Sequence, residues 1–177
     1  QRLHKVLEGI LAKDIKHPGA CHLYVHATES TFVPERAAAC AEFLGDSIPG
    51  ASHINHMPSH AWNQLGRWGD SVRANLEAWH NDQKAAAGSL DGVAIYPPHN
   101  LGMLSFAASY DGQGAIAVQA ARDQLRFGAN RTDELLALIR FGRFDDVLAI
   151  TQRTEGPDGA FWDFAHGYAR LKKGEAD

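Results

Sequence analysis

The chain has 177 residues, a formal net charge of −4 and an apolar share of 45%. This length suits one compact domain or an elongated repeat array, and the apolar share is ordinary for a folded protein. The negative charge gives no electrostatic case for nucleic acid, and no apolar run approaches the roughly 20 residues of a membrane helix. The composition therefore predicts a soluble folded protein that binds neither nucleic acid nor a membrane.

Apolar residues recur at helical spacing along nearly the whole chain. The ranges with this spacing are 3–12, 34–46, 71–82, 101–110, 114–126, 133–142 and 161–174. Apolar side chains at i, i+3, i+4 and i+7 form one face of an amphipathic helix, and prolines and glycines separate the ranges. Residues 95–99 are the one short strand candidate, and two prolines interrupt it. The pattern predicts an all-α protein.

Other features concern the ends, the cysteines and an insertion. The chain begins inside a helical pattern and stops where another is about to begin, so we expect it to be a piece of a longer protein of undetermined compartment. Cys21 and Cys40 are too few for a disulfide framework; one bridge is an alternative, but two buried free thiols are the favoured interpretation. Residues 81–98 are long for a loop between repeats and could cover a site next to them.

A turn recurs between the predicted helices. It consists of a glycine, a polar residue and usually a bulky aromatic residue, as in Gly66-Arg67-Trp68 and Gly142-Arg143-Phe144. The turn glycines are Gly66, Gly112, Gly142 and Gly174, with separations of 46, 30 and 32 residues. A period near 34 residues of helix-turn-helix units is typical of tetratricopeptide repeats.

The chain resembles the tetratricopeptide-repeat (TPR) family over nearly its whole length. Besides the turns, Ala117 and Ala121 match the small packing positions of the family, and Trp162, Gly167 and Tyr168 match the pattern of its first helix. The resemblance implies a right-handed solenoid of antiparallel helix pairs, with about five units in a single domain over residues 1–177 and the terminal units incomplete. It also implies that the first helix of each unit lines a concave groove.

Histidines are concentrated in the first hundred residues. Seven of the ten histidines fall in three runs, which are His17, His22 and His26, then His53, His56 and His60, then His99. Two pairs, His22/His26 and His56/His60, have the i,i+4 spacing that puts both rings on one face of a helix. Pro58 lies inside the second pair, so a helix there either begins at Pro58 or is kinked.

The family register gathers these histidines. The groove positions of the second unit are His53, His56 and His60, and the third unit adds His99, Gly102 and Phe106. His22 and His26 of the first unit fall at or next to the same positions. In the fourth and fifth units these positions are apolar or aromatic for the most part. The resemblance therefore implies one histidine cluster at one end of the groove.

A further resemblance supports a shared site. Three segments, around HPGACHLYVHATE, HMPSH and YPPHNLG, are similar to a bacterial subgroup of TPR-like proteins. The chain keeps the histidines and Glu29 of that pattern, but it has Gly102 where the pattern has a histidine.

The residue types predict a metal site. Neutral imidazole is a common metal ligand near neutral pH, and a carboxylate three residues after His26 adds an oxygen donor. We therefore predict a divalent transition-metal site, zinc or copper first, with iron or manganese also compatible. The predicted ligands are His22, His26, Glu29, His56, His60 and His99.

Three functions follow as alternatives. The first is metal-dependent chemistry on a small substrate, because a metal with an open position activates water and polarises carbonyls. The second is a non-catalytic scaffold that binds a peptide or a protein in the groove, with the histidines in a structural hydrogen-bond network. The third is a small-molecule pocket without a metal. His4, His80 and His166 are interpreted as structural or solvated residues, and His17 as the residue that starts a helix.

Overall fold

The computed structural model describes residues 2–88 and 96–175, and within them it is helical with no strand. The N-terminal half contains α1 (Arg2–Leu11), α2 (Pro18–Glu29), the 3-10 helix η1 (Pro34–Ala37), α3 (Ala38–Ser47), α4 (Ser52–His56), α5 (Pro58–Gln64) and α6 (Trp68–Ala87). The C-terminal half contains α7 (Pro97–Tyr110), α8 (Gly114–Gln124), η2 (Leu125–Phe127), α9 (Thr132–Arg140), α10 (Phe144–Ala149) and α11 (Pro157–Lys173). The predicted all-α class is confirmed.

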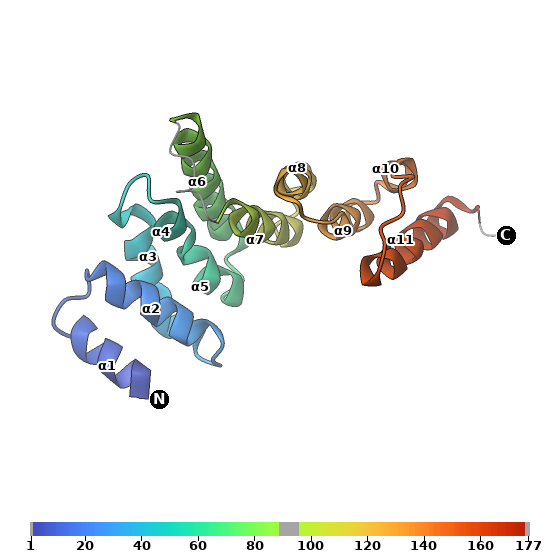
Figure 1. Cartoon of the computed structure of the whole chain (residues 1–177). Coiled ribbons are helices and arrows are strands. Elements are labelled where there is room, and N and C mark those ends of the chain that lie inside the picture. Colours follow the sequence, from blue (N-terminus) through green and yellow to red (C-terminus); the bar gives the residue numbers. More distant parts are fainter. Residues whose placement is uncertain (1, 89–95, 176–177) are drawn as a thin grey trace.

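The helices follow one another in space as they do in the sequence (Figure 1). Packing joins consecutive helices, and it also joins next-but-one helices such as α3 with α5, α7 with α9 and α9 with α11. The chain therefore runs from α1 at one end of the molecule to α11 at the other. No described helix is both long and apolar enough to cross a membrane.

The four predicted turn glycines end four helices in the same way. Gly66, Gly112, Gly142 and Gly174 all have positive φ, between 67° and 78°. The amide of the residue after each glycine donates to the carbonyl five residues earlier, at 2.8 Å for Arg67 to Trp62 and 2.9 Å at the other three sites. This is the Schellman helix ending, in which glycine adopts the left-handed conformation at no steric cost. The repeated sequence turn is thus a repeated backbone structure.

The side chains after two of these glycines repeat as well. Arg67 Nε donates to Asp70 at 2.5 Å, and Arg143 Nε donates to Asp146 at 2.6 Å. In both copies the aspartate lies in the first turn of the next helix, where a carboxylate also interacts favourably with the helix dipole. Each arginine therefore ties the turn to the first turn of the helix that follows it.

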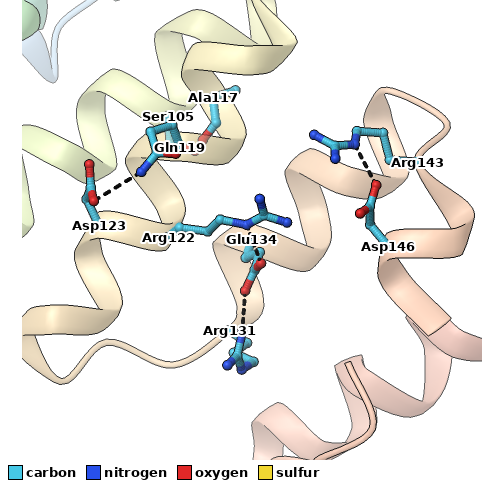
Figure 2. A network of polar contacts seen from close by, with 9 residues as sticks. All are labelled: Ser105, Ala117, Gln119, Arg122, Asp123, Arg131, Glu134, Arg143 and Asp146. Carbon is cyan, nitrogen blue, oxygen red and sulfur yellow. Dashed lines mark hydrogen bonds and ion pairs between the residues drawn. The ribbon is translucent and has the colours of Figure 1, made fainter. Parts of the chain in front are cut away.

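A buried carboxylate ties α8 to α9. Glu134 is 3% exposed, and its two oxygens accept from Arg122 Nε at 2.8 Å and from Arg131 Nη1 at 2.6 Å (Figure 2). A buried carboxylate is tolerated when charged donors satisfy both of its oxygens. This arrangement fixes α9 against α8 in the C-terminal half of the array.

Two apolar cores are separated by buried polar side chains. One core joins α1, α2, α3 and α5, and the other joins α6 to α11. Between them, on α4 to α7, lie most of the buried polar side chains: Asn55, His56, Ser59, Ser71, Asn75, Asn81, Asp82, Asn100 and Ser105. Buried polar groups destabilise a fold unless they have hydrogen-bond partners. Their concentration on four consecutive helices therefore indicates a polar network in this region.

The expected loop insertion before His99 needs correction. Residues 81–87 of the expected loop insertion belong to α6, and Pro97 and Pro98 open α7 rather than a strand. Pro97 suits the first turn of a helix, because the amide that proline lacks has no partner there. Residues 89–95, on which a covering role would depend, lie outside the described residues.

The two cysteines form a disulfide, so the prediction of two free thiols was wrong. Cys21 on α2 and Cys40 on α3 are both buried, and their Cα atoms are 4.9 Å apart. This separation lies in the usual range for a bridge. The cysteine count alone could not place the two residues on packed faces of neighbouring helices. The bridge fastens α2, which carries three of the predicted ligands, to α3.

Replacing both cysteines by serine is expected to lower the free energy of unfolding by about 3 kcal/mol. The bridge closes a loop across a sequence separation of 19 residues, and a loop of this size restricts the unfolded chain by about that amount. Urea unfolding of both proteins checks this. A reductant should produce the same loss in the native protein and no change in the double variant; equal stability of the oxidised and reduced native protein would contradict it.

Candidate metal centre

Four helices supply the candidate ligands. Helix α2 carries His22, His26 and Glu29, α4 carries His53 and His56, α5 carries His60, and α7 carries His99. All these side chains lie in one continuous group, in which neighbouring rings are about 5 Å apart between centroids. The structure therefore brings together every predicted ligand, and we refer to the six histidines as the histidine cluster.

Pro58 divides the second histidine run, because a helix begins there, which was one of the two predicted alternatives. Helix α4 ends at His56 and α5 begins at Pro58, with Met57 in helical conformation between them. A helix that begins at Pro58 leaves His53 and His56 outside it, and in the structure these two residues lie in the separate short helix α4. The break still leaves the rings of His56 and His60 close, with Nε2 atoms 3.3 Å apart.

The histidines divide into two sets of three. In each set one nitrogen from each ring lies within 4.8 Å of the others. The first triad is His22, His26 and His53, and the second triad is His56, His60 and His99. The first triad joins α2 to α4, and the second joins α4, α5 and α7. The two triads adjoin each other, with the rings of His26 and His60 4.9 Å apart and those of His53 and His56 5.2 Å apart.

Each triad contains a pair of Nε2 atoms at the spacing of ligands that share a metal. The pair His22 and His53 is 3.1 Å apart, and the pair His56 and His60 is 3.3 Å apart. Two nitrogens bound tetrahedrally to one zinc ion at the usual bond length lie about 3.3 Å from each other. Each pair is within hydrogen-bonding distance, and the same spacing fits two ligands of one ion in both triads.

Glu29 lies between the triads. Its Oε1 accepts from His26 Nδ1 at 3.1 Å, and its Oε2 accepts from His60 Nδ1 at 2.5 Å. A carboxylate only accepts hydrogen bonds, so each contact places the ring proton on Nδ1. The Nε2 atoms of His26 and His60 are then the nitrogens with free lone pairs, as in the carboxylate–histidine pairs that orient metal ligands.

Burial holds most of these imidazoles in the neutral form. It lowers the pKa of His56 to about 2 and the pKa values of His53 and His60 to about 4. Burial likewise lowers the pKa values of His22 and His99, and the charge of neighbouring histidines acts in the same direction. Near neutral pH the cluster therefore offers neutral rings, which is the state that binds a metal.

Further polar side chains support the second triad. Ser59 Oγ lies 3.4 Å from His56 Nδ1, and a hydrogen bond with the buried Asn75 side chain acts against the lowered pKa of His56. Burial decreases from His56, which is fully buried, to His99, which is exposed. The second triad thus reaches solvent on the side of His99, while its innermost ligand is shielded.

Two features of the site differ from the sequence prediction. His53 was placed at a groove position but was left out of the ligand set, although its Nε2 faces His22 and its buried Nδ1 has no hydrogen-bond partner in the described part of the chain. Its register position was the signal that could have included it. Tyr96, which stacks on His53 with ring centroids 4.3 Å apart, was not considered at all.

Gly102 does not extend the cluster. A Cβ added there would lie 2.8 Å from Gln124 Nε2, which donates to the Pro98 carbonyl at 2.8 Å. The Gln124 side chain therefore occupies the space in which a larger residue at position 102 would begin. Gly102 therefore leaves room for a contact that joins α7 to α8 through Gln124.

The remaining histidines lie outside the cluster. His17 caps α2 by accepting from the Ala20 amide at 3.1 Å, as expected for a residue before Pro18. His166 Nδ1 lies 3.0 Å from the Trp162 carbonyl, and the two rings stack. These contacts agree with the structural roles that the sequence predicted for them.

No protein-family model, curated protein or solved structure matches this chain. The geometry of the site and the repeated helix endings therefore carry the functional argument.

Proposed function

We propose that this chain is a TPR-like helical-repeat protein whose histidine cluster binds a divalent transition metal, copper or zinc, and supports metal-dependent chemistry on a small substrate. The observation that carries the proposal is the pair of Nε2–Nε2 distances of 3.1 and 3.3 Å among rings that burial keeps neutral. Imidazole donors favour zinc, copper, iron and nickel over magnesium or calcium. The carboxylate–histidine contacts of Glu29 support the same assignment.

The repeat part of the proposal rests on the turns. Four helices end in the same Schellman geometry at Gly66, Gly112, Gly142 and Gly174, and two copies share the following Arg–Asp contact. A solenoid of such units would place the first helix of each unit on one concave surface. The histidine-bearing helices α2, α4, α5 and α7 would then form one end of this surface.

The catalytic part rests on coordination number. A catalytic zinc ion has three protein ligands and an open position for water or substrate, whereas a structural site is closed by four. Each triad supplies three imidazoles, and the exposure of His99 leaves a path for a small molecule. Lewis-acid activation of a bound oxygen is therefore the chemistry that this cluster would support.

An apolar pocket favours the second candidate function, a scaffold that binds an apolar peptide. The pocket has a volume of about 430 Å³ and lies between α7 and α9, where Phe106, Tyr110 and Leu136 line it and are exposed. Under this alternative the histidines stabilise the packing of α2 against α4 and α5. It predicts that the protein binds peptide without metal and that metal removal does not change peptide affinity.

Metal analysis separates the two candidates. Tag-free protein that has been dialysed against copper or zinc and desalted is expected to retain at least one equivalent of metal. Added metal at about a hundred times its dissociation constant should stabilise the fold by about 3 kcal/mol, seen as a higher melting temperature. Retention of less than about a tenth of an equivalent, with no thermal shift, would overturn the metal proposal.

A further inference from the structure

The histidine cluster has more donors than one ion can use. Six imidazoles and one carboxylate lie together, whereas zinc takes four ligands as a rule and the other imidazole-binding metals seldom take more than six. A single ion with four ligands would leave the remaining imidazoles only hydrogen bonds to neighbouring rings or to Glu29. The buried Nδ1 of His53 already lacks a hydrogen-bond partner among the described residues.

The six imidazoles divide evenly into the two triads. Each triad brings three nitrogens within 4.8 Å, and each contains one Nε2 pair at the spacing of ligands that share a metal. The two sets have no residue in common. They lie side by side, because His53 and His56 are three residues apart on α4 and their ring centroids are 5.2 Å apart.

Glu29 joins the two sets symmetrically. One of its oxygens contacts His26 of the first triad, and the other contacts His60 of the second. Such a carboxylate fixes the tautomer and orientation of one ligand in each set, and its two contacts couple the sets mechanically. A third grouping, His26 with Glu29 and His60, would instead make Glu29 a direct ligand of a single central ion.

We propose that the cluster is a dinuclear centre, with one transition-metal ion bound by His22, His26 and His53 and a second bound by His56, His60 and His99. This inference rests on the proposed metal-binding function. Glu29 is a positioning residue for both ions, and each ion keeps one open position. Because the triads adjoin, the two open positions can bind one small oxygen-donor ligand together, as in two-metal sites whose ions are about 3.5–4 Å apart.

The test is metal stoichiometry in the whole chain, with copper(II) as the probe and with any affinity tag removed. Native protein is expected to bind two copper ions, and the variant with His22→Ala and His53→Ala is expected to bind one. The matched control, with His4→Ala and His80→Ala outside the cluster, should still bind two. Circular dichroism verifies that each variant is folded.

Electron paramagnetic resonance gives an independent measure. Two copper(II) ions that share a bridging ligand at about 4 Å couple their spins, so the native protein should show much less signal than its copper content. The variant with His22→Ala and His53→Ala should show the full signal of one isolated copper ion. A variant that fails to fold is replaced by His22→Gln with His53→Gln, which retains more of the side-chain volume.

The outcomes separate the two proposals. Binding of no copper would overturn the proposed function itself. Binding of one copper ion by the native protein would overturn the dinuclear centre but leave metal binding intact, and it would favour Glu29 as a direct ligand. Two ions in the variant without His22 and His53 would overturn the assignment of the first triad.

Discussion

Replacing both His56 and His60 by alanine is expected to eliminate tight metal binding at the second triad. The two Nε2 atoms are 3.3 Å apart, and their loss leaves only the exposed His99 at this position. Loss of a residue that hydrogen-bonds to a metal ligand weakens metal affinity by about 10–100-fold. Loss of two direct ligands should therefore weaken metal affinity by more than about 100-fold. One equivalent of metal, and any turnover that depends on it, should disappear.

Loss of this equivalent of metal should also lower the stability of the protein in the presence of metal. An ion present at about a thousand times its dissociation constant stabilises the native state by about 4 kcal/mol. For a chain of this length such a loss corresponds to about 10 °C in melting temperature. Melting curves with and without metal measure the stabilisation by bound metal separately from the packing defect. The packing defect of the alanine variant affects both curves, whereas bound metal affects only the curve recorded with metal.

Two controls make the experiment decisive. His166→Ala removes another buried histidine, which lies on α11 outside the cluster, so it should lower stability without changing metal content. His56→Gln with His60→Gln retains more of the volume at the site and should still lose the metal. A double alanine variant that keeps its full metal content would contradict the assignment of His56 and His60 as ligands. A variant whose stability falls while its metal binding stays unchanged would support the scaffold alternative.

The helices and the histidine cluster were predictable because short-range patterns encode them. Apolar spacing marked the helices, and glycine at the recurring turn marked the helix ends, since these positions need positive φ. The repeat register then placed histidines from α2, α4, α5 and α7 on one side. That inference combined the spacing of residues along the chain with the groove positions that the resemblance to TPR proteins implies.

The sequence predictions that were wrong or incomplete concern features that depend on contacts between helices. The Cys21–Cys40 bridge requires that α2 and α3 pack face to face, which two cysteines 19 positions apart do not specify. His53 already held a groove position in the register, and the structure adds that it lies in a separate helix, α4, before Pro58. Glu29 was predicted as an oxygen donor near His26, but only the packing of α5 on α2 showed that it also reaches His60.

The pairing of the buried polar side chains on α4 to α7 could not be derived from the sequence. Asparagine is mostly an exposed residue type, yet Asn55, Asn81 and Asn100 are all buried. Asn81 donates to Asn55 at 3.0 Å, and Asn100 donates to Asp82 at 2.8 Å. These partners are 26 and 18 residues apart, and no local periodicity links them.

The metal-free protein is expected to lose stability steeply as the pH falls below about 6.5. Burial lowers the pKa of His56 from an ordinary 6.5 to about 2, so between these values the unfolded chain binds a proton that the folded chain excludes. The stabilisation is therefore complete above the unfolded pKa and is lost as the pH falls through the window between the two values. From about pH 7.5 to about pH 4.5 this linkage removes about 3 kcal/mol for His56 alone.

His53 and His60 act in the same direction, because burial lowers both of their pKa values to about 4. Urea unfolding of chelator-treated protein across this pH range measures the loss. His56→Gln should be less stable near neutral pH, but its stability should fall less steeply with acid, since it lacks the group that titrates. With metal present the fall should be steeper than in the metal-free protein, because protons compete with the ion for the same nitrogens. Parallel pH curves for the native protein and His56→Gln would mean that His56 is not the residue whose protonation unfolds the chain, and that its imidazole is not held neutral for a metal.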